Sequence, residues 1–253
     1  FIAGMADTSG AYAAWIAKPL AERGADGPFT MATPDLRGPQ GVTPAQQHTD
    51  LALSQCNGAS TTCKRYFVNR PQGADPQSSP TWGLSNYDHA RFWSWRTSGD
   101  GTARNGKLVF FTLAELNMLE AEGQIRKGNY AAAAALINKT RTTNGLPAIT
   151  AFDATSPVPG GSACVPKVPV GPTFNTVACG TMMEALKWEK RNEEAYTGFI
   201  QWFLDGRGWG DLPSATPLFW PVPYQDLQAR GRSLSQIYST GGGTLPGSAA
   251  KGT

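Results

Sequence analysis

Histidine and charge are both scarce in this chain of 253 residues, which has two histidines and 16% charged residues. His48 and His89 are too few for a histidine-rich metal centre and argue against a histidine-based catalytic triad. A net formal charge of +3 gives no basis for binding nucleic acid or an acidic membrane surface. No apolar run approaches the ~20 residues that a membrane-spanning helix needs. We therefore expect a globular protein without a metal, a cofactor or a nucleic-acid partner.

Cysteine is also sparse, with four residues in two pairs. Cys56 and Cys63 flank a short polar stretch, and Cys164 and Cys179 bracket a loop rich in Pro and Val. An even count, with each pair inside its own loop, favours two disulfides, Cys56–Cys63 and Cys164–Cys179, and an oxidising compartment. Free thiols are the alternative. Zinc is disfavoured because the chain lacks a Cys-x-x-Cys pair.

Glycine and proline are abundant, with 29 and 19 residues. They punctuate residues 24–106 and 150–180, which we expect to be irregular, with short strand-like pieces such as residues 64–69. A region as long as 24–106 is expected to be packed and functional, because mere connections are shorter. One helix is expected before it, over residues 8–23, kinked or ended by Pro19.

A helical hairpin is predicted from Thr112 onward, after the region rich in glycine and proline. Residues 112–127 begin with Thr112 and Glu115 in capping-box spacing, and Gly128 provides a stop. An alanine-rich helix over residues 130–144 follows after a two-residue turn, so the two helices should be antiparallel. The geometry is like that of a tetratricopeptide repeat, although a second copy is not found in the chain.

A third helix is predicted from Thr181 to about Leu204. Carboxylates interrupt its apolar stripe, which runs along Leu186, Glu189, Glu193, Tyr196 and Ile200. Arg191 and Glu194 lie on neighbouring lines. Because an unpaired buried charge is costly, we expect these charges to be partly buried and mutually paired.

The predicted fold class is mainly α, a tetratricopeptide-like helical hairpin scaffold with long irregular loops and few short strands. We expect one domain portion over residues 1–253. Residues 1–106 would form a loop-rich region with one helix. Residues 107–253 would form a helical core with the Pro/Gly-rich loop 150–180 and an extended C-terminal tail.

Several short motifs follow one another in a fixed order over residues 112–230. They comprise Ala121-Glu122, Arg126, Gly128-Asn129, Ile137-Asn138, Arg141, Glu189, Arg191, Glu194, Gly198, Trp202, Asp205, Arg207, Trp209-Gly210, Pro221-Val222-Pro223 and Leu227. In order and spacing, more than in any single motif, they resemble the C-terminal half of the SusD/RagB family. The segments RYFVNRP and WGLSNYDHARFWSW fit the middle region of the same family.

The resemblance implies a binding protein and not an enzyme. Family members are bacterial outer-membrane lipoproteins that capture glycans and other nutrients at the cell surface. Each caps a SusC-like TonB-dependent barrel as a hinged lid. We therefore expect an exported protein on the outer face of the outer membrane, with its signal and lipid anchor outside this sequence.

The stretch GFIQWFLDGRGWGDLPSATPLFWPVP, residues 198–223, admits two interpretations. Asp205 and Asp211 would be an acid/base pair with Arg207 as a substrate clamp, which is the glycoside hydrolase hypothesis. The resemblance instead implies a structural role, because these positions recur in proteins that perform no reaction. The predicted structural set is Glu189, Arg191, Glu194, Asp205, Arg207 and Trp209.

The predicted ligand site is the aromatic segment of residues 82–96, WGLSNYDHARFWSWR. Sugar rings lay their C–H faces on flat aromatic rings while their hydroxyl groups meet polar side chains. The candidate residues are Trp82, Asn86, Tyr87, Trp93, Trp95 and Arg96. The alternative is that Trp93 and Trp95 form one face of a buried strand. A scaffold subunit of the cell envelope, whose helical face binds protein only, is a further functional hypothesis.

Overall fold

The computed structural model describes residues 2–49, 66–69, 87–89, 91, 109–170, 176–198, 200–212 and 224–231. The chain divides after Thr197 into two compact units, which are treated separately below. About half of the described residues are helical and the strands are few and short, so the fold is mainly α. Within these ranges, no helix has the length and apolarity needed to cross a membrane.

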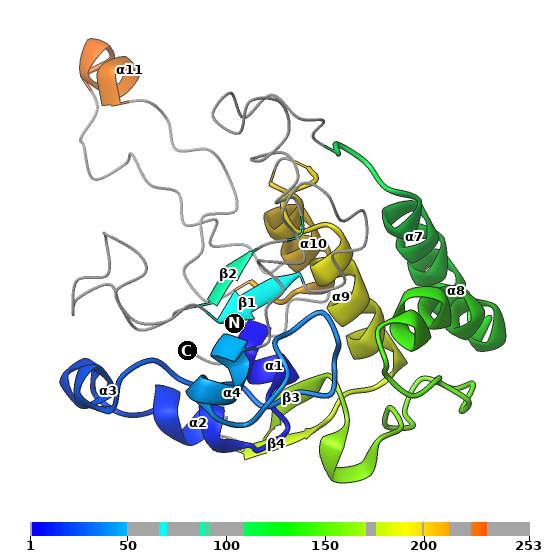
Figure 1. Ribbon diagram of the computed structural model, residues 1–253. Helices are drawn as coiled ribbons and strands as arrows, with labels where there is room; N and C mark the ends of the chain where they lie inside the picture. The colour runs from blue at the N-terminus through cyan, green and yellow to red at the C-terminus, as the bar shows by residue number, and fades with distance from the viewer. Residues whose placement is uncertain are drawn as a thin grey trace, which may run out of the picture. The chain divides into compact units, whose positions relative to one another are not determined.

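Four short helices form in the N-terminal residues (Figure 1). They are α1 (Ile2–Ala6), α2 (Ala11–Ile16), α3 (Leu20–Asp26) and α4 (Pro44–Thr49). The prediction of one helix in this region is therefore wrong. Pro19 stands before α3 with ψ of 149°, outside the helical range, and it separates α2 from α3. With five and six residues, α1 and α4 are too short to show a helical period in the sequence.

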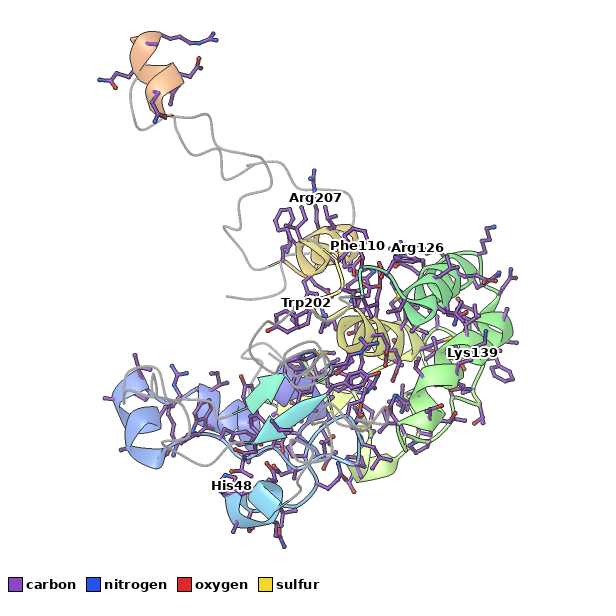
Figure 2. The ribbon with its side chains drawn as sticks, turned by 45° about the horizontal axis from the view of Figure 1, so that its top comes forward. His48, Phe110, Arg126, Lys139, Trp202 and Arg207 are labelled. Atoms are coloured by element: carbon purple, nitrogen blue, oxygen red, sulfur yellow. A yellow bond between two sulfur atoms is a disulfide. The ribbon has the colours of Figure 1, made fainter. Side chains whose placement is uncertain are left out.

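The predicted helical hairpin is confirmed by α7 (Leu113–Arg126) and α8 (Tyr130–Thr143), which lie side by side in Figure 1. The Thr112 hydroxyl accepts the backbone N–H of Glu115 at 3.0 Å, which caps the first helix. Gly128, at φ of 79°, turns the chain into the second helix. Lys139, labelled in Figure 2, donates from α8 to the amide oxygen of Asn117 on α7 at 3.3 Å.

The third helix is shorter than predicted. Helix α9 (Met182–Glu193) packs against α7 and α8, and its C-terminal cap is Glu194. Tyr196 and Ile200 then adopt left-handed backbone conformations, with φ of 64° and 56°, and cannot continue a right-handed helix. The predicted run to Leu204 is therefore interrupted. The second unit contains α10 (Gln201–Trp209) and α11 (Tyr224–Ala229).

Two antiparallel hairpins supply the described strands. Strand β1 (Phe67–Asn69) pairs with β2 (Tyr87–His89), and Phe67 lies opposite His89. This confirms the strand expected within residues 64–69. A 3-10 turn, η1 (Gly161–Ala163), precedes the second hairpin of β3 (Lys167–Val170) and β4 (Thr176–Cys179). We predicted only a loop over residues 150–180 from its glycine and proline content. Strand β3 forms although it contains Pro169, a residue type that disfavours strands.

One buried hydrophobic cluster of the first unit draws on irregular segments as much as on helices. Phe29 and Tyr87 pack against its edge. Its buried residues are Met5, Ala6, Met31, Leu146, Val165 and Trp188. Of these, two come from α1 and one from α9, and the other three come from segments without regular structure. Described parts of the predicted loops, at Met31 and Val165, are therefore part of the packed framework.

The disulfide between Cys164 and Cys179 is confirmed, and it joins the turn after η1 to the end of β4. The predicted Cys56–Cys63 disulfide lies outside the described residues.

Replacing both Cys164 and Cys179 with Ser should lower the free energy of unfolding by about 2–4 kcal/mol. The bridge spans 15 residues of sequence, and removing it restores conformational freedom to that loop in the unfolded chain. Urea denaturation under non-reducing conditions measures the change. Ser162→Ala, in the same loop, is the control and should leave the midpoint unchanged. Equal midpoints for wild type and the double variant would contradict the prediction.

Candidate functional site

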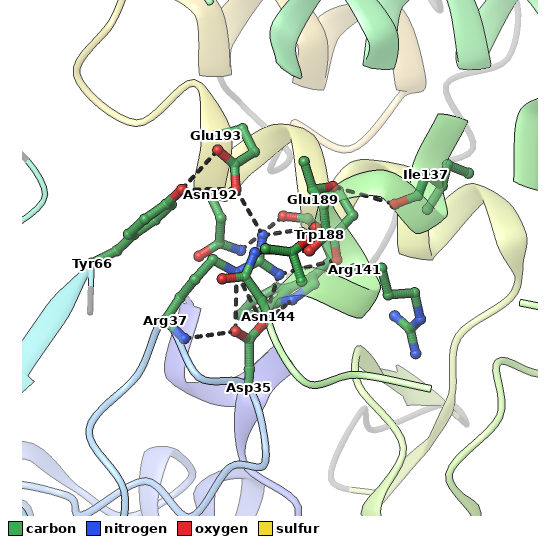
Figure 3. A network of polar contacts seen from close by, with 12 residues as sticks. Asp35, Arg37, Tyr66, Ile137, Arg141, Asn144, Trp188, Glu189, Asn192 and Glu193 are labelled. Carbon is green, nitrogen blue, oxygen red and sulfur yellow. Dashed lines mark hydrogen bonds and ion pairs between the residues drawn. The ribbon is translucent and has the colours of Figure 1, made fainter. Parts of the chain in front are cut away.

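A buried ion network is centred on Arg37 (Figure 3). Its guanidinium pairs with Asp35, with Nη2 to Oδ2 at 2.7 Å, and with Glu189, with Nη1 to Oε2 at 2.7 Å. Glu193 approaches the same guanidinium at 3.2 Å. None of these four side chains is more than 4% exposed. Charges this deeply buried are tolerated only when they are paired and hydrogen-bonded.

Three further side chains complete the network. The indole of Trp188 donates to Asp35 at 2.8 Å. The Tyr66 hydroxyl donates to Glu193 at 2.9 Å, and Arg91 pairs with the same carboxylate at 3.0 Å. Each of the six carboxylate oxygens of Asp35, Glu189 and Glu193 accepts at least one hydrogen bond. The network is therefore fully satisfied on its acidic side. From here on, "buried ion network" means Asp35, Arg37, Tyr66, Arg91, Trp188, Glu189 and Glu193.

Local sequence positions these groups. Glu189 and Glu193 are four residues apart on α9, so both project from one face of the helix. Asp35 accepts the backbone N–H of Arg37 at 3.0 Å, and this turn brings its carboxylate beside the guanidinium. The segment around Arg37 is also fixed through its backbone, because the Arg37 carbonyl accepts from the N–H groups of Tyr66 and Phe67.

Burial and ion pairing act in opposite directions on the charged groups of the network. Burial opposes the charge on Arg37, but Asp35 and Glu189 raise its pKa well above the ordinary value. Burial alone would raise the pKa of Asp35, yet the charge and hydrogen bonds of Arg37 lower it. Burial raises the pKa of Glu189, and the Arg37 charge offsets part of that rise. Burial, followed by the Glu193 charge, raises the pKa of Tyr66.

The predicted structural residues at α9, Glu189, Arg191 and Glu194, each contact different partners. Glu189 lies in the buried ion network. Arg191 is buried and donates to the Met5 sulfur at 3.1 Å, and Glu194 pairs with Lys190 at 3.8 Å. The pairing partner of Glu189 is Arg37, 152 residues away, and not a neighbour on the same helix as we expected.

Asp35, Tyr66 and Arg91 were not predicted as site residues. The sequence signal that points to an ion pair here is the Asp-x-Arg spacing of residues 35–37 within a proline-rich loop.

Arg141 adds positive charge beside the network. It lies fully buried on α8, and its Nε donates to the carbonyl of Pro147 at 2.7 Å. Its two Nη atoms have no hydrogen-bond partner among the described residues. Burial lowers the pKa of Arg141, and the Glu189 charge opposes that shift. The charge of Glu189 therefore favours the charged form of the Arg141 guanidinium.

The remaining predicted structural residues belong to the second unit. Asp205, Arg207 and Trp209 are half-buried on α10, and Gly210, at φ of 74°, ends that helix. The Asp211 N–H donates to the carbonyl of Gly206 at 2.8 Å. The structural role of Asp205, Arg207 and Trp209 stays a prediction, as does the alternative acid/base pair Asp205 and Asp211.

The predicted ligand residues are mostly outside the described residues. Those outside are Trp82, Asn86, Trp93, Trp95 and Arg96. Tyr87 is described and half-buried. Its ring packs on the core, its hydroxyl donates to Gln47 at 2.9 Å, and that hydroxyl accepts the N–H of Met31 at 2.7 Å. Tyr87 therefore holds the β1–β2 hairpin on the framework, and its contact with a ligand stays a prediction.

His89, two residues further along, lies in a small column of rings. Its imidazole is 5.3 Å from the Phe67 ring in an edge-to-face arrangement and 4.7 Å from the Tyr196 ring. Burial, together with the nearby Arg91 charge, lowers the pKa of His89 to about 4. The imidazole is therefore uncharged at neutral pH.

Metal chemistry finds no support in the described ranges, which contain no group of three or more His, Cys, Asp or Glu side chains arranged to hold an ion. Comparisons with protein-family models, with curated proteins and with solved structures found no match.

Acidification should destabilise the protein through His89. Its pKa is about 4 in the fold and about 6.5 in an unfolded chain, so the unfolded state binds an extra proton between these values. The free energy of unfolding should therefore fall by roughly 1–3 kcal/mol as the pH drops from 7 to 4.5. Urea denaturation at both pH values measures the fall, and His89→Asn should show a smaller one. Equal falls in the two proteins would contradict the assignment.

Proposed function

We propose that the protein is a cell-surface nutrient receptor of the SusD/RagB type, which binds a glycan and works with a TonB-dependent outer-membrane transporter. It performs no chemistry on its ligand. The ordered motifs over residues 112–230 support this proposal. So does the helical hairpin α7–α8 packed on α9, whose short turn and close antiparallel helices suit a tetratricopeptide-like scaffold.

The observation that carries the proposal is the buried ion network. It ties an irregular segment, residues 35–37, and the β1–β2 hairpin to a helix of the scaffold. Irregular segments held rigidly on regular elements are the usual way in which proteins build recognition surfaces. A glycoside hydrolase instead needs two carboxyl groups that face its substrate. On α9, Glu189 and Glu193 are both occupied by Arg37 in the protein interior.

A protein partner is supported by the outer face of α7. Leu113, Leu116 and Leu119 are exposed on α7. Glu115, Met118 and Ala121 of the same helix are buried. The exposed apolar residues, called the α7 apolar face below, are Val109, Phe110, Phe111, Leu113, Leu116 and Leu119. Phe110 is labelled in Figure 2.

Contiguous exposed apolar side chains mark protein interaction sites. We propose that the barrel transporter is the partner and that the protein lies on the outer surface of the outer membrane. The same face also favours the second candidate function, a scaffold subunit of an envelope assembly that binds protein only.

Purification of tagged protein from its native cells in mild detergent tests the partner. We expect a large β-barrel protein to co-purify with wild type, and Leu113→Ser/Leu116→Ser to reduce its yield at least about tenfold. The melting temperature should hardly change, because both side chains are exposed. Leu20→Ser, at an exposed leucine on α3, is the matched control and should retain the partner.

Two outcomes would contradict the proposal. Recovery of other envelope proteins without a barrel would favour the scaffold function. Full recovery of the barrel with the double variant would show that the α7 apolar face does not contact the barrel.

A further inference from the structure

Tyr196 combines high exposure with an unfavourable backbone. It follows the C-terminal cap of α9, has φ of 64°, and is 75% exposed. A non-glycine residue with a bulky side chain is a genuine outlier in this region and costs roughly 1–2 kcal/mol. Glycine would fit this turn without strain. An exposed aromatic ring at such a position contributes little burial in return, so its presence points to a role outside folding.

The ring of Tyr196 is supported from beneath. His89 of β2 lies 4.7 Å away at an interplanar angle of 49°, and His89 itself rests against Phe67 of β1. The β1–β2 hairpin is in turn fixed by Asn69 and Tyr87, which both donate to the side-chain oxygen of Gln47 at 2.9 Å. The three rings therefore form a column that begins in the framework and ends at an exposed tyrosine.

Among the described residues, the titratable groups His89 and Arg91 beside this column are uncharged or ion-paired. The low pKa of His89, about 4, leaves its imidazole uncharged at neutral pH. The nearby Arg91 is occupied by Glu193, at 3.0 Å, and by the carbonyl of the same residue. A flat aromatic surface without a charge suits a ligand that has an apolar face and an uncharged polar rim. A neutral pyranose ring has both, because its axial C–H groups lie on one face and its hydroxyl groups on the edge.

We propose that Tyr196, supported by His89, is the platform on which a neutral pyranose ring of the ligand stacks. This inference rests on the proposed function and names a contact residue for it. It also accounts for a juxtaposition in the structure. His89 belongs to the aromatic segment of residues 82–96, and Tyr196 lies just past the end of α9, yet their rings meet.

Binding to a panel of neutral polysaccharides (starch, xylan, mannan and mixed-linkage β-glucan), with polygalacturonate as the charged member, tests the inference. Affinity electrophoresis would identify the bound polymer, and calorimetry with its hexasaccharide would give the dissociation constant. Tyr196→Ala should weaken binding by about tenfold or more, and Tyr196→Phe, which keeps the ring, by less than about threefold. Phe152→Ala, at another exposed aromatic residue of the first unit, is the control and should bind as wild type.

A folding readout separates loss of contact from loss of structure. Tyr196→Gly removes the ring and relieves the backbone strain, so it should lose binding with no fall in melting temperature. Wild-type affinity in Tyr196→Ala and Tyr196→Gly would overturn the platform and leave the receptor function standing. Binding of polygalacturonate alone would overturn the neutral ligand. If the wild type binds none of the polymers, the proposed glycan-receptor function is overturned, and the platform with it.

Discussion

The guanidinium of Arg37 lies away from water, and the first unit is organised around the groups that solvate it. Asp35 approaches from its own turn, and Glu189 and Glu193 approach from α9. The Arg37 carbonyl holds the start of β1. Removing one partner from such a cluster leaves an uncompensated buried charge, so its members stabilise the fold only together. A loop, a hairpin and a helix distant in sequence are thereby fixed in one arrangement.

The buried ion network distinguishes the residues that hold the fold together from the surfaces that are available for binding. Glu189 and Glu193 are paired with Arg37 inside the protein, and the Tyr87 hydroxyl is hydrogen-bonded to Gln47 and Met31. The first unit also presents exposed apolar and aromatic side chains. The α7 apolar face suits a protein neighbour, and the column ending at Tyr196 suits a flat neutral ligand. Both surfaces depend on elements that the network and the core hold in place.

Local signals in the sequence predict part of this structure. The α7–α8 hairpin follows from Thr112, Gly128 and the alanine-rich pattern, and the Cys164–Cys179 bridge follows from two cysteines in one loop. Pairing over long distances could not be predicted, because Arg37 and Glu189 are 152 residues apart and carry no local pattern that joins them. The break after α9 was missed because the apolar spacing continues through Ile200. The short helices α1 and α4 contain too few residues to show a period.

A double-mutant cycle between Arg37 and Glu189 tests the central claim most directly. The free energy of unfolding would be measured by urea denaturation for Arg37→Met, Glu189→Gln and the double variant, beside a control cycle on the exposed pair Arg126 and Glu122. The buried pair should couple by at least about 2 kcal/mol, and the exposed pair by at most about 0.5 kcal/mol. Additive effects at Arg37 and Glu189, with each single change costing less than about 1 kcal/mol, would contradict the account.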